Sequence, residues 1–169
     1  MAQKKCQVCK ADVAPGTLPE ISGQEGSLAV TVHHLPVLVC PNGHRLFANP
    51  DFPLQLLDRL VERDAATLPA STSKGLLIKH YHCASCGKRL ADAPDQQHTF
   101  HLDVELPEVA PFDVELTMPV HRCPSCGHEQ VHSLKEVRSR APAALAHAFK
   151  GAAIAAPAKT ASRKVFIVP

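Results

Sequence analysis

Hydrophobic and polar residues alternate along two stretches of the chain, a pattern typical of half-buried β-strands. In the first stretch, Leu28, Val30 and Val32 alternate with small or polar residues before the run 36–39 leads into Cys40. The second stretch has the same alternation before Cys123, at Phe100, Leu102, Val104, Leu106, Phe112, Val114, Leu116 and Met118. Each stretch therefore predicts an antiparallel hairpin or a three-stranded sheet.

Helical periodicity occupies two other segments. Residues 51–64 predict a helix that Asp51 caps and that carries one apolar face, formed by Phe52, Leu56, Leu57, Leu60 and Val61. Ser133 and Glu136 have the spacing of a capping box, and Pro142 is expected to start a second turn of Ala-rich helix that ends before Gly151.

Composition favours small units that need additional stabilisation. The 169 residues include 15 Pro but only six Phe, one Tyr and no Trp, so a large aromatic core is excluded. We expect a first unit with its covering helix (1–64), a linker (65–78), a second unit (79–131), a helical segment (132–156) and a tail (157–169). A shared sheet and two independent units are both compatible with this pattern.

The seven Cys residues all lie in four short clusters, which begin at Cys6, Cys40, Cys83 and Cys123. An odd number argues against a complete set of disulfides, and no signal peptide precedes the first cluster. No apolar run reaches the roughly 18 residues that span a bilayer. We therefore expect a cytoplasmic protein without membrane contact, in which Cys pairs bind metal.

The second half of the chain has a complete set of zinc ligands. Zinc takes four tetrahedral thiolate or imidazole ligands, and a two-residue gap lets one tight turn direct two sulfurs at the same ion. A thioredoxin-like redox motif is disfavoured, because the first of these pairs is followed by a strand-like region. The predicted ligands of this site are Cys83, Cys86, Cys123 and Cys126.

The first half has three Cys, and His44 is the predicted fourth ligand. The segment 35–44 resembles 118–128 but lacks a residue at the position of Cys126, so the two halves look like a diverged duplication. An imidazole is long enough to replace the missing thiolate. His33 or His34 is an alternative ligand, and a site completed by water would be catalytic. His128 is expected outside the ligand shell. The first site is predicted to comprise Cys6, Cys9, Cys40 and His44, giving two Zn²⁺ ions per chain.

These patterns predict a mainly β, metal-stabilised protein with tandem zinc β-ribbons, one helix after the first ribbon and a helical C-terminal segment. Catalysis is not expected, because the sequence has no HExxH motif, deaminase signature or Gly-rich phosphate loop. We expect an interaction module whose partner is another protein.

Nucleic acid is the alternative partner, because residues 133–169 carry a net charge of +6 while the preceding residues carry −4. Few aromatic side chains accompany this charge, which disfavours recognition of single strands by stacking. A solvated helix face followed by a frayed terminus explains the same charges without a ligand. The basic residues are Lys135, Arg138, Arg140, Lys150, Lys159, Arg163 and Lys164.

The opening segment resembles the YgiT-type zinc finger of the N-terminal domain in MqsA-like antitoxins. The resemblance is carried by Cys6-x2-Cys9 and by Leu-Pro-Val-Leu-Val-Cys-Pro-Asn-Gly-His at 35–44; it covers about residues 1–48 and, weakly, 79–131. It implies a zinc domain that binds a protein. Here the usual second CxxCG is Cys-Pro-Asn-Gly-His and no helix-turn-helix follows, so toxin neutralisation and operator binding are not carried over.

Overall fold

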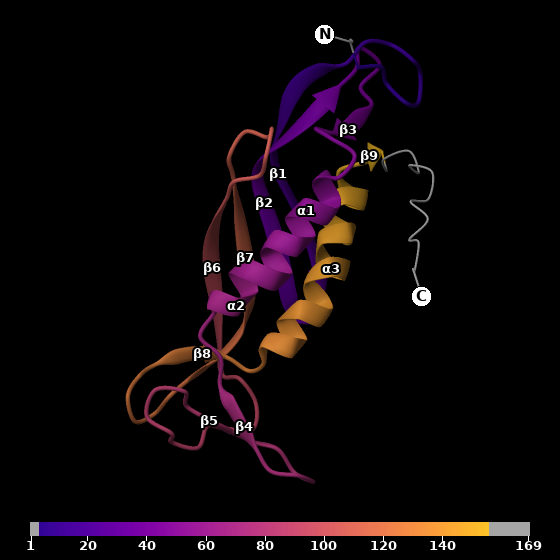
Figure 1. Ribbon diagram of the computed structural model, residues 1–169. Coiled ribbons are helices and arrows are strands. Elements are labelled where there is room, and N and C mark those ends of the chain that lie inside the picture. Colours follow the sequence, from indigo (N-terminus) through magenta and orange to yellow (C-terminus); the bar gives the residue numbers. More distant parts are fainter. Residues whose placement is uncertain (1–3, 156–169) are drawn as a thin grey trace, which may run out of the picture.

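A computed structural model describes residues 4–155 (Figure 1). The protein is mainly β, as predicted, and its largest element is a seven-stranded sheet. This sheet contains β1 (Ala14–Glu25), β2 (Leu28–Val39), β3 (Arg45–Phe47), β6 (Gln96–Val104), β7 (Phe112–Arg122), β8 (Glu129–Val131) and β9 (Ile154–Ala155). A separate hairpin is formed by β4 (Thr72–Lys74) and β5 (His80–His82).

Two long hairpins, β1–β2 and β6–β7, join edge to edge into one sheet. Strand β2 runs antiparallel to β7, with Thr31 opposite Glu115 and Val32 opposite Val114. Short strands extend the pairing at both ends, because β3 adds to the end of β2 and β8 to the end of β7. The two halves of the chain therefore share one sheet, which is one of the two arrangements that the sequence left open.

Helices cover one face of this sheet (Figure 1). They are α1 (Phe52–Asp58), the π-helical turn η1 (Arg59–Asp64), α2 (Ala65–Thr67) and α3 (Leu134–Gly151). Helix α3 lies so close to β1 that a Cβ atom on Gly23 would come 2.1 Å from the carbonyl oxygen of Ala144. The space between the layers is filled by aliphatic side chains and by a row of four rings, each in contact with the next, those of Phe149, Phe47, Phe52 and Phe112.

The ends of the helices differ from the expectations. Neither Asp51 nor Ser133 makes a side-chain capping hydrogen bond. Glu136 does not complete a capping box but forms an ion pair with Arg140 at 2.7 Å. Pro142 lies inside the continuous helix α3 rather than at the start of a second one. Eight residues precede Pro142 in α3, so the apolar face packed on the sheet outweighs the local cost of this proline.

The segment 65–78, expected as a linker, contains regular structure. It includes α2 and β4, and Ala70 forms an isolated bridge with Val131 at the end of β8. The chain between the two halves is thus attached to the sheet. The predicted tail at 157–169, with Lys159, Arg163 and Lys164, lies outside the described residues.

Candidate metal centres

Two clusters of Cys and His side chains lie at opposite ends of the sheet. Within each cluster, the candidate ligand atoms all lie within 4.8 Å of one another. The clusters follow the ends of β2 and β7, and these antiparallel strands end at opposite ends of the molecule (Figure 1). We call them site 1 (Cys6, Cys9, Cys40 and His44) and site 2 (Cys83, Cys86, Cys123 and Cys126).

Three of the four Cys-containing turns have the same backbone geometry. The N–H of the first Cys donates to the carbonyl five positions later, and the residue four positions later donates back to the carbonyl of that Cys. This returning residue has a positive φ in each case, which glycine adopts without strain in two of them. The returning residues are Lys10 (φ 65°), Gly87 (φ 74°) and Gly127 (φ 71°).

The fourth turn is one residue shorter, and this places His44 at site 1. Here the Cys40 N–H donates to the carbonyl of His44 at 3.1 Å, and Gly43, at φ 78°, donates back to Cys40 at 2.9 Å. The position equivalent to Cys126 is therefore absent. The Nδ1 atom of His44 fills its place, 3.4 Å from the sulfur of Cys40 and 3.7 Å from that of Cys6.

The other histidines considered from the sequence lie outside the clusters. His33 belongs to the middle of β2, where its imidazole lies 3.3 Å from a carboxylate oxygen of Glu115. His34 follows it in the same strand. His128 contributes its backbone carbonyl to the turn at Cys123. The fold therefore selects His44 among the candidates for the fourth position of site 1.

The spacing of the ligand atoms matches tetrahedral zinc. With Zn–S bonds of about 2.3 Å, two sulfurs on one ion lie about 3.8 Å apart. The sulfur pairs of the clusters are separated by 3.7 Å (Cys9–Cys40), 3.6 Å (Cys83–Cys126) and 3.5 Å (Cys86–Cys123). A disulfide needs about 2.05 Å, and all seven Cys are free thiols. Both donor sets therefore suit a four-coordinate zinc ion.

Hydrogen bonds in site 1 favour a thiolate. The backbone N–H of Ala11 and the side chain of Asn42 lower the pKa of Cys9 to about 6. Burial has the opposite effect on Cys40, whose pKa it raises. Because zinc binds the thiolate form, the Cys9 thiol is more readily available to a metal ion than that of Cys40.

Site 2 shows a similar division between its thiols. Burial raises the pKa of Cys83, but hydrogen bonds from the backbone of Cys86 and the side chain of Gln130 outweigh it and lower the pKa to about 6. The Lys88 backbone lowers the pKa of Cys86, yet the neighbouring sulfur of Cys123 raises it to about 12 overall. Before a metal ion binds, Cys83 is therefore favoured as a thiolate and Cys86 as a protonated thiol.

The polar residues behind site 2 were not anticipated from the sequence. Gln130 is fully buried in β8, and its Oε1 accepts a hydrogen bond from the Ala84 N–H at 2.9 Å. Opposite Gln130 in the register lies His121, whose Nε2 is 2.9 Å from Nδ1 of His132. The ring of Tyr81 packs on His132 with a centroid distance of 3.6 Å. The available signal in the sequence was Gln130, an amide side chain in the short strand-like segment that follows the Cys123 turn.

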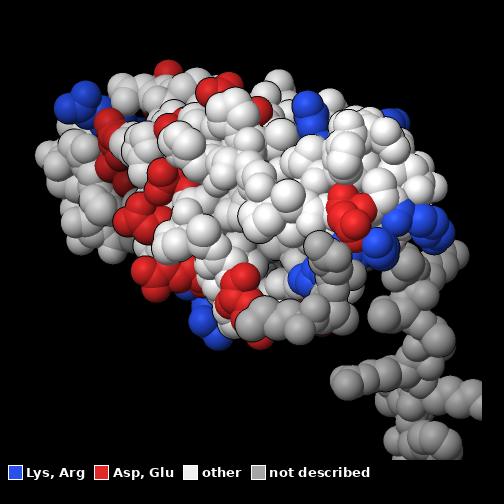
Figure 2. Space-filling view, turned by 90° about the horizontal axis from the view of Figure 1, so that it is seen from above, with Lys and Arg blue, Asp and Glu red and all other residues white. Residues whose placement is uncertain are grey.

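The basic residues of α3 differ in whether their side chains bond within the molecule. Arg138 donates to the carbonyl of Val61, and Arg140 donates to Ser27 Oγ at 2.6 Å. Lys135 and Lys150 are exposed near opposite ends of the helix. Figure 2 shows Lys and Arg side chains at separate places on the face viewed, without a continuous basic patch.

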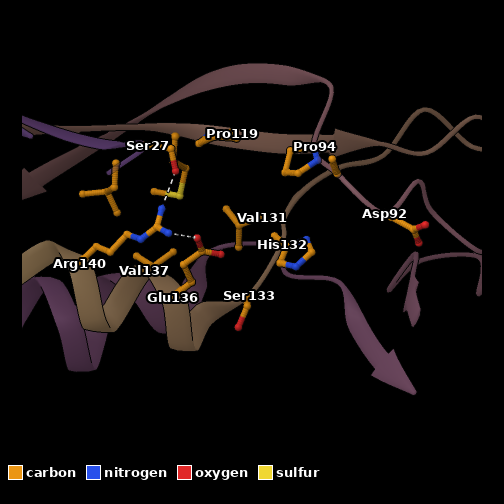
Figure 3. Close-up of a pocket in the computed structure, with 13 residues that line it drawn as sticks. Ser27, Asp92, Pro94, Pro119, Val131, His132, Ser133, Glu136, Val137 and Arg140 are labelled. Carbon is orange, nitrogen blue, oxygen red and sulfur yellow. Dashed lines mark hydrogen bonds and ion pairs between the residues drawn. The ribbon is translucent and has the colours of Figure 1, made fainter. Parts of the chain in front are cut away.

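A cavity of about 350 Å³ lies between the start of α3 and the β1–β2 turn (Figure 3). Of its charged side chains, Glu136 and Arg140 pair with each other, the same Arg140 binds Ser27, and Asp92 pairs with Arg89. The rest of the wall includes apolar side chains such as Val131 and Val137. Glu136 and Arg140 thus serve the packing of α3 against the hairpin.

No helix among residues 4–155 is long and apolar enough to cross a membrane. The chain matches no known family model, and neither the curated proteins nor the solved structures compared with it include a match. The resemblance to the YgiT-type zinc finger therefore stays a prediction.

Proposed function

We propose that the protein is a tandem zinc β-ribbon in which two zinc ions stabilise a scaffold for binding another protein. The observation that carries the proposal is that each cluster offers four nitrogen or sulfur ligands at tetrahedral spacing. Four protein ligands close the coordination shell of zinc, as in structural sites, whereas catalytic zinc keeps one position for water or substrate. We assign the zinc ions a stabilising role and expect no catalysis at them.

The free edge of β6 supports a protein as the partner. Among the described strands, β6 pairs only with β7, which leaves its outer row of backbone groups available to an extended segment. The other edge strand, β1, contains Pro15 and Pro19, which lack the N–H that a new strand would need. Strand β6 has no proline. We therefore place the protein-binding surface at β6.

Nucleic acid is the second candidate, with Lys135, Arg138, Arg140 and Lys150 as the contacts. The separation of the exposed lysines and the internal bonds of both arginines disfavour a continuous phosphate-binding surface within the described residues. Salt-dependent retention on DNA or RNA that is lost in a Lys135→Ala, Lys150→Ala variant would favour this candidate instead.

The zinc sites can be tested by X-ray absorption at the zinc edge. The proposal predicts one ion bound by three sulfurs and one nitrogen and another bound by four sulfurs. An oxygen ligand at site 1 would contradict closed coordination and would support a catalytic zinc.

Substitution of His44 gives a sharper test because the chain offers a matched control. His44→Ala is expected to lose the zinc of site 1, since its Nδ1 atom is the fourth donor. His128→Ala, at the equivalent position of the longer turn, is expected to keep both ions. Retention of two zinc ions by His44→Ala, with unchanged stability, would overturn the assignment.

The partner surface can be tested by photo-cross-linking in the protein's own cells. A cross-linking amino acid at Gln97 lies on β6, and one at Gln24 lies on β1 as a matched control, since both glutamines are exposed. A protein adduct from position 97 alone is expected. An equal adduct from position 24, or none from position 97, would contradict the placement. The free thiols are compatible with the reducing cytoplasm in which we place the protein.

A further inference from the structure

Three consecutive aliphatic residues project into solvent at the turn between β4 and β5. Leu76 and Leu77 are fully exposed, at 103% and 99%, and Ile78 is 71% exposed. Single exposed aliphatic residues are ordinary on protein surfaces, but a run of three at one tip is rare without a function. We call Leu76, Leu77 and Ile78 the apolar tip.

The apolar tip is held by a defined turn. Strands β4 and β5 pair up to Lys74 and His80, directly beside the turn. Gly75 has φ +115°, and a Cβ atom there would lie 2.0 Å from the carbonyl oxygen of Ile78. Only glycine allows the backbone to close in this way. The three side chains are thus presented together at the end of a hairpin.

The hairpin is anchored on the site 2 end of the sheet, from which it projects (Figure 1). Ala70 bridges to Val131, and the hydroxyl of Ser71 donates to the carbonyl of His132 at 2.6 Å. Strand β5 leads directly into Cys83. The zinc of site 2 would therefore help to fix the base from which the apolar tip extends.

Positive charge surrounds the apolar tip. Lys74 and Lys79 flank it in the sequence, and Lys79 and Lys135 line the same shallow hollow beside the hairpin. The side chains of these three lysines form no ion pair or hydrogen bond within residues 4–155. Between Asp64 and Asp92 the chain contains no acidic residue. The ammonium groups next to the tip are therefore available to an anionic partner.

We propose that the apolar tip inserts into the surface of a membrane that contains anionic lipids. A bilayer offers hydrocarbon to the aliphatic side chains and, just outside it, phosphate groups to the flanking lysines. The convex, protruding shape suits a deformable surface without a preformed pocket. This contact is peripheral and reversible, since few side chains enter the bilayer. The proposed membrane contact replaces the expectation that the protein does not bind membranes. It does not depend on a protein partner at β6.

Flotation of the full-length, zinc-loaded protein with lipid vesicles tests the proposal. We expect binding to vesicles of phosphatidylcholine with phosphatidylserine, and weaker binding to phosphatidylcholine alone or at high salt. Leu77→Ser should weaken the binding about tenfold. The Lys74→Ala, Lys79→Ala variant should weaken it about fivefold or more. Leu54→Ser, at a 69% exposed leucine of α1, is the matched control and should bind like the wild type.

Each variant is checked for its zinc content, so that a folding defect at site 2 is distinguished from a loss of membrane contact. Absence of vesicle binding by folded, zinc-loaded protein would overturn the proposal. So would equal loss of binding in Leu77→Ser and Leu54→Ser. Self-association that requires Leu77, measured by sedimentation without lipid, would assign the tip to a second copy of the chain and also overturn it.

Discussion

Site 1 and site 2 share the backbone geometry of their Cys turns but differ in what lies behind them. Behind site 1, the paired residues of β2 and β3 are Leu38 and Leu46, which pack on its cysteines. At the equivalent place behind site 2, β7 and β8 pair His121 with Gln130. Similar local turns can therefore be supported by hydrocarbon at one end of a sheet and by a hydrogen-bonding network at the other.

The sites also differ in exposure. In site 1, Cys6 and Cys40 are buried, while Cys9 and His44 are partly buried. In site 2, two of the four cysteines are exposed. Site 1 is thus more deeply integrated in the fold, whereas site 2 lies beside the polar network and the β4–β5 hairpin. This contrast predicts unequal consequences when the two sites are disturbed.

Removal of one ligand from site 1 is expected to have the largest effect. Cys40→Ser should lose one zinc ion and lower the free energy of unfolding by several kcal/mol, because zinc binding contributes directly to folding. The matched variant Cys123→Ser should also lose one ion but destabilise less, since its cluster is more exposed. Thermal unfolding together with zinc analysis measures both. A greater loss of stability in Cys123→Ser would break the comparison.

Truncation of a core side chain between the two sites is expected to have the next largest effect on stability. Phe52 is fully buried and lies 5.6 Å from Phe47 and 5.7 Å from Phe112, measured between ring centroids. Phe52→Ala should lower the free energy of unfolding by about 3–5 kcal/mol. Both zinc ions should remain bound in the folded protein.

Denaturant unfolding of Phe52→Ala gives the stability change, with Leu54→Ala as a control. Leu54 lies in the same helix with its side chain exposed, so its truncation should change stability by less than about 0.5 kcal/mol. Loss of zinc from folded Phe52→Ala would show that the sites depend on the core more strongly than the two-ended account allows.

The smallest expected effects come from two single substitutions that give each site the residue found behind the other, Gln130→Leu and Leu46→Gln. Gln130→Leu gives site 2 the residue found at site 1 and should weaken zinc binding about 10-fold or more, because the Ala84 N–H in the Cys83 turn loses its acceptor and the amide no longer lowers the pKa of Cys83. Leu46→Gln should instead cost about 1–3 kcal/mol of stability by burying an amide without partners. Competition with a chelator measures the first effect, and denaturant unfolding measures the second. Equal zinc affinity in Gln130→Leu and the wild type would remove the proposed role of this amide.

Local patterns in the sequence predicted much of the arrangement of strands and candidate ligands. Alternation of apolar residues located β2 and β7, because each side chain in a strand faces the opposite side from its neighbour. The comparison of 35–44 with 118–128 located the shorter turn and His44, since one deleted residue changes only the local hydrogen bonds. The eight predicted ligands are the residues that the fold brings together; their occupation by zinc stays a prediction.

Local patterns did not predict features that depend on residues far apart in the sequence. The register that places Val32 opposite Val114 joins strands far apart in the chain, and no local pattern specifies it. Pro142 reads locally as the start of a helix, yet the packing of α3 against β1 keeps it inside one. The capping box failed for a local reason instead, because Glu136 pairs with Arg140 one turn further along the same helix. Tertiary contacts decided the strand register and the place of Pro142.

The number of zinc ions per chain tests the central claim most directly. Native mass spectrometry of the protein, gently isolated from its own cells, would count the ions and retain bound partners. Two zinc ions per folded chain are predicted, one at each end of the sheet. A folded chain with one zinc ion or none, or with disulfides among the cysteines of either cluster, would contradict the account.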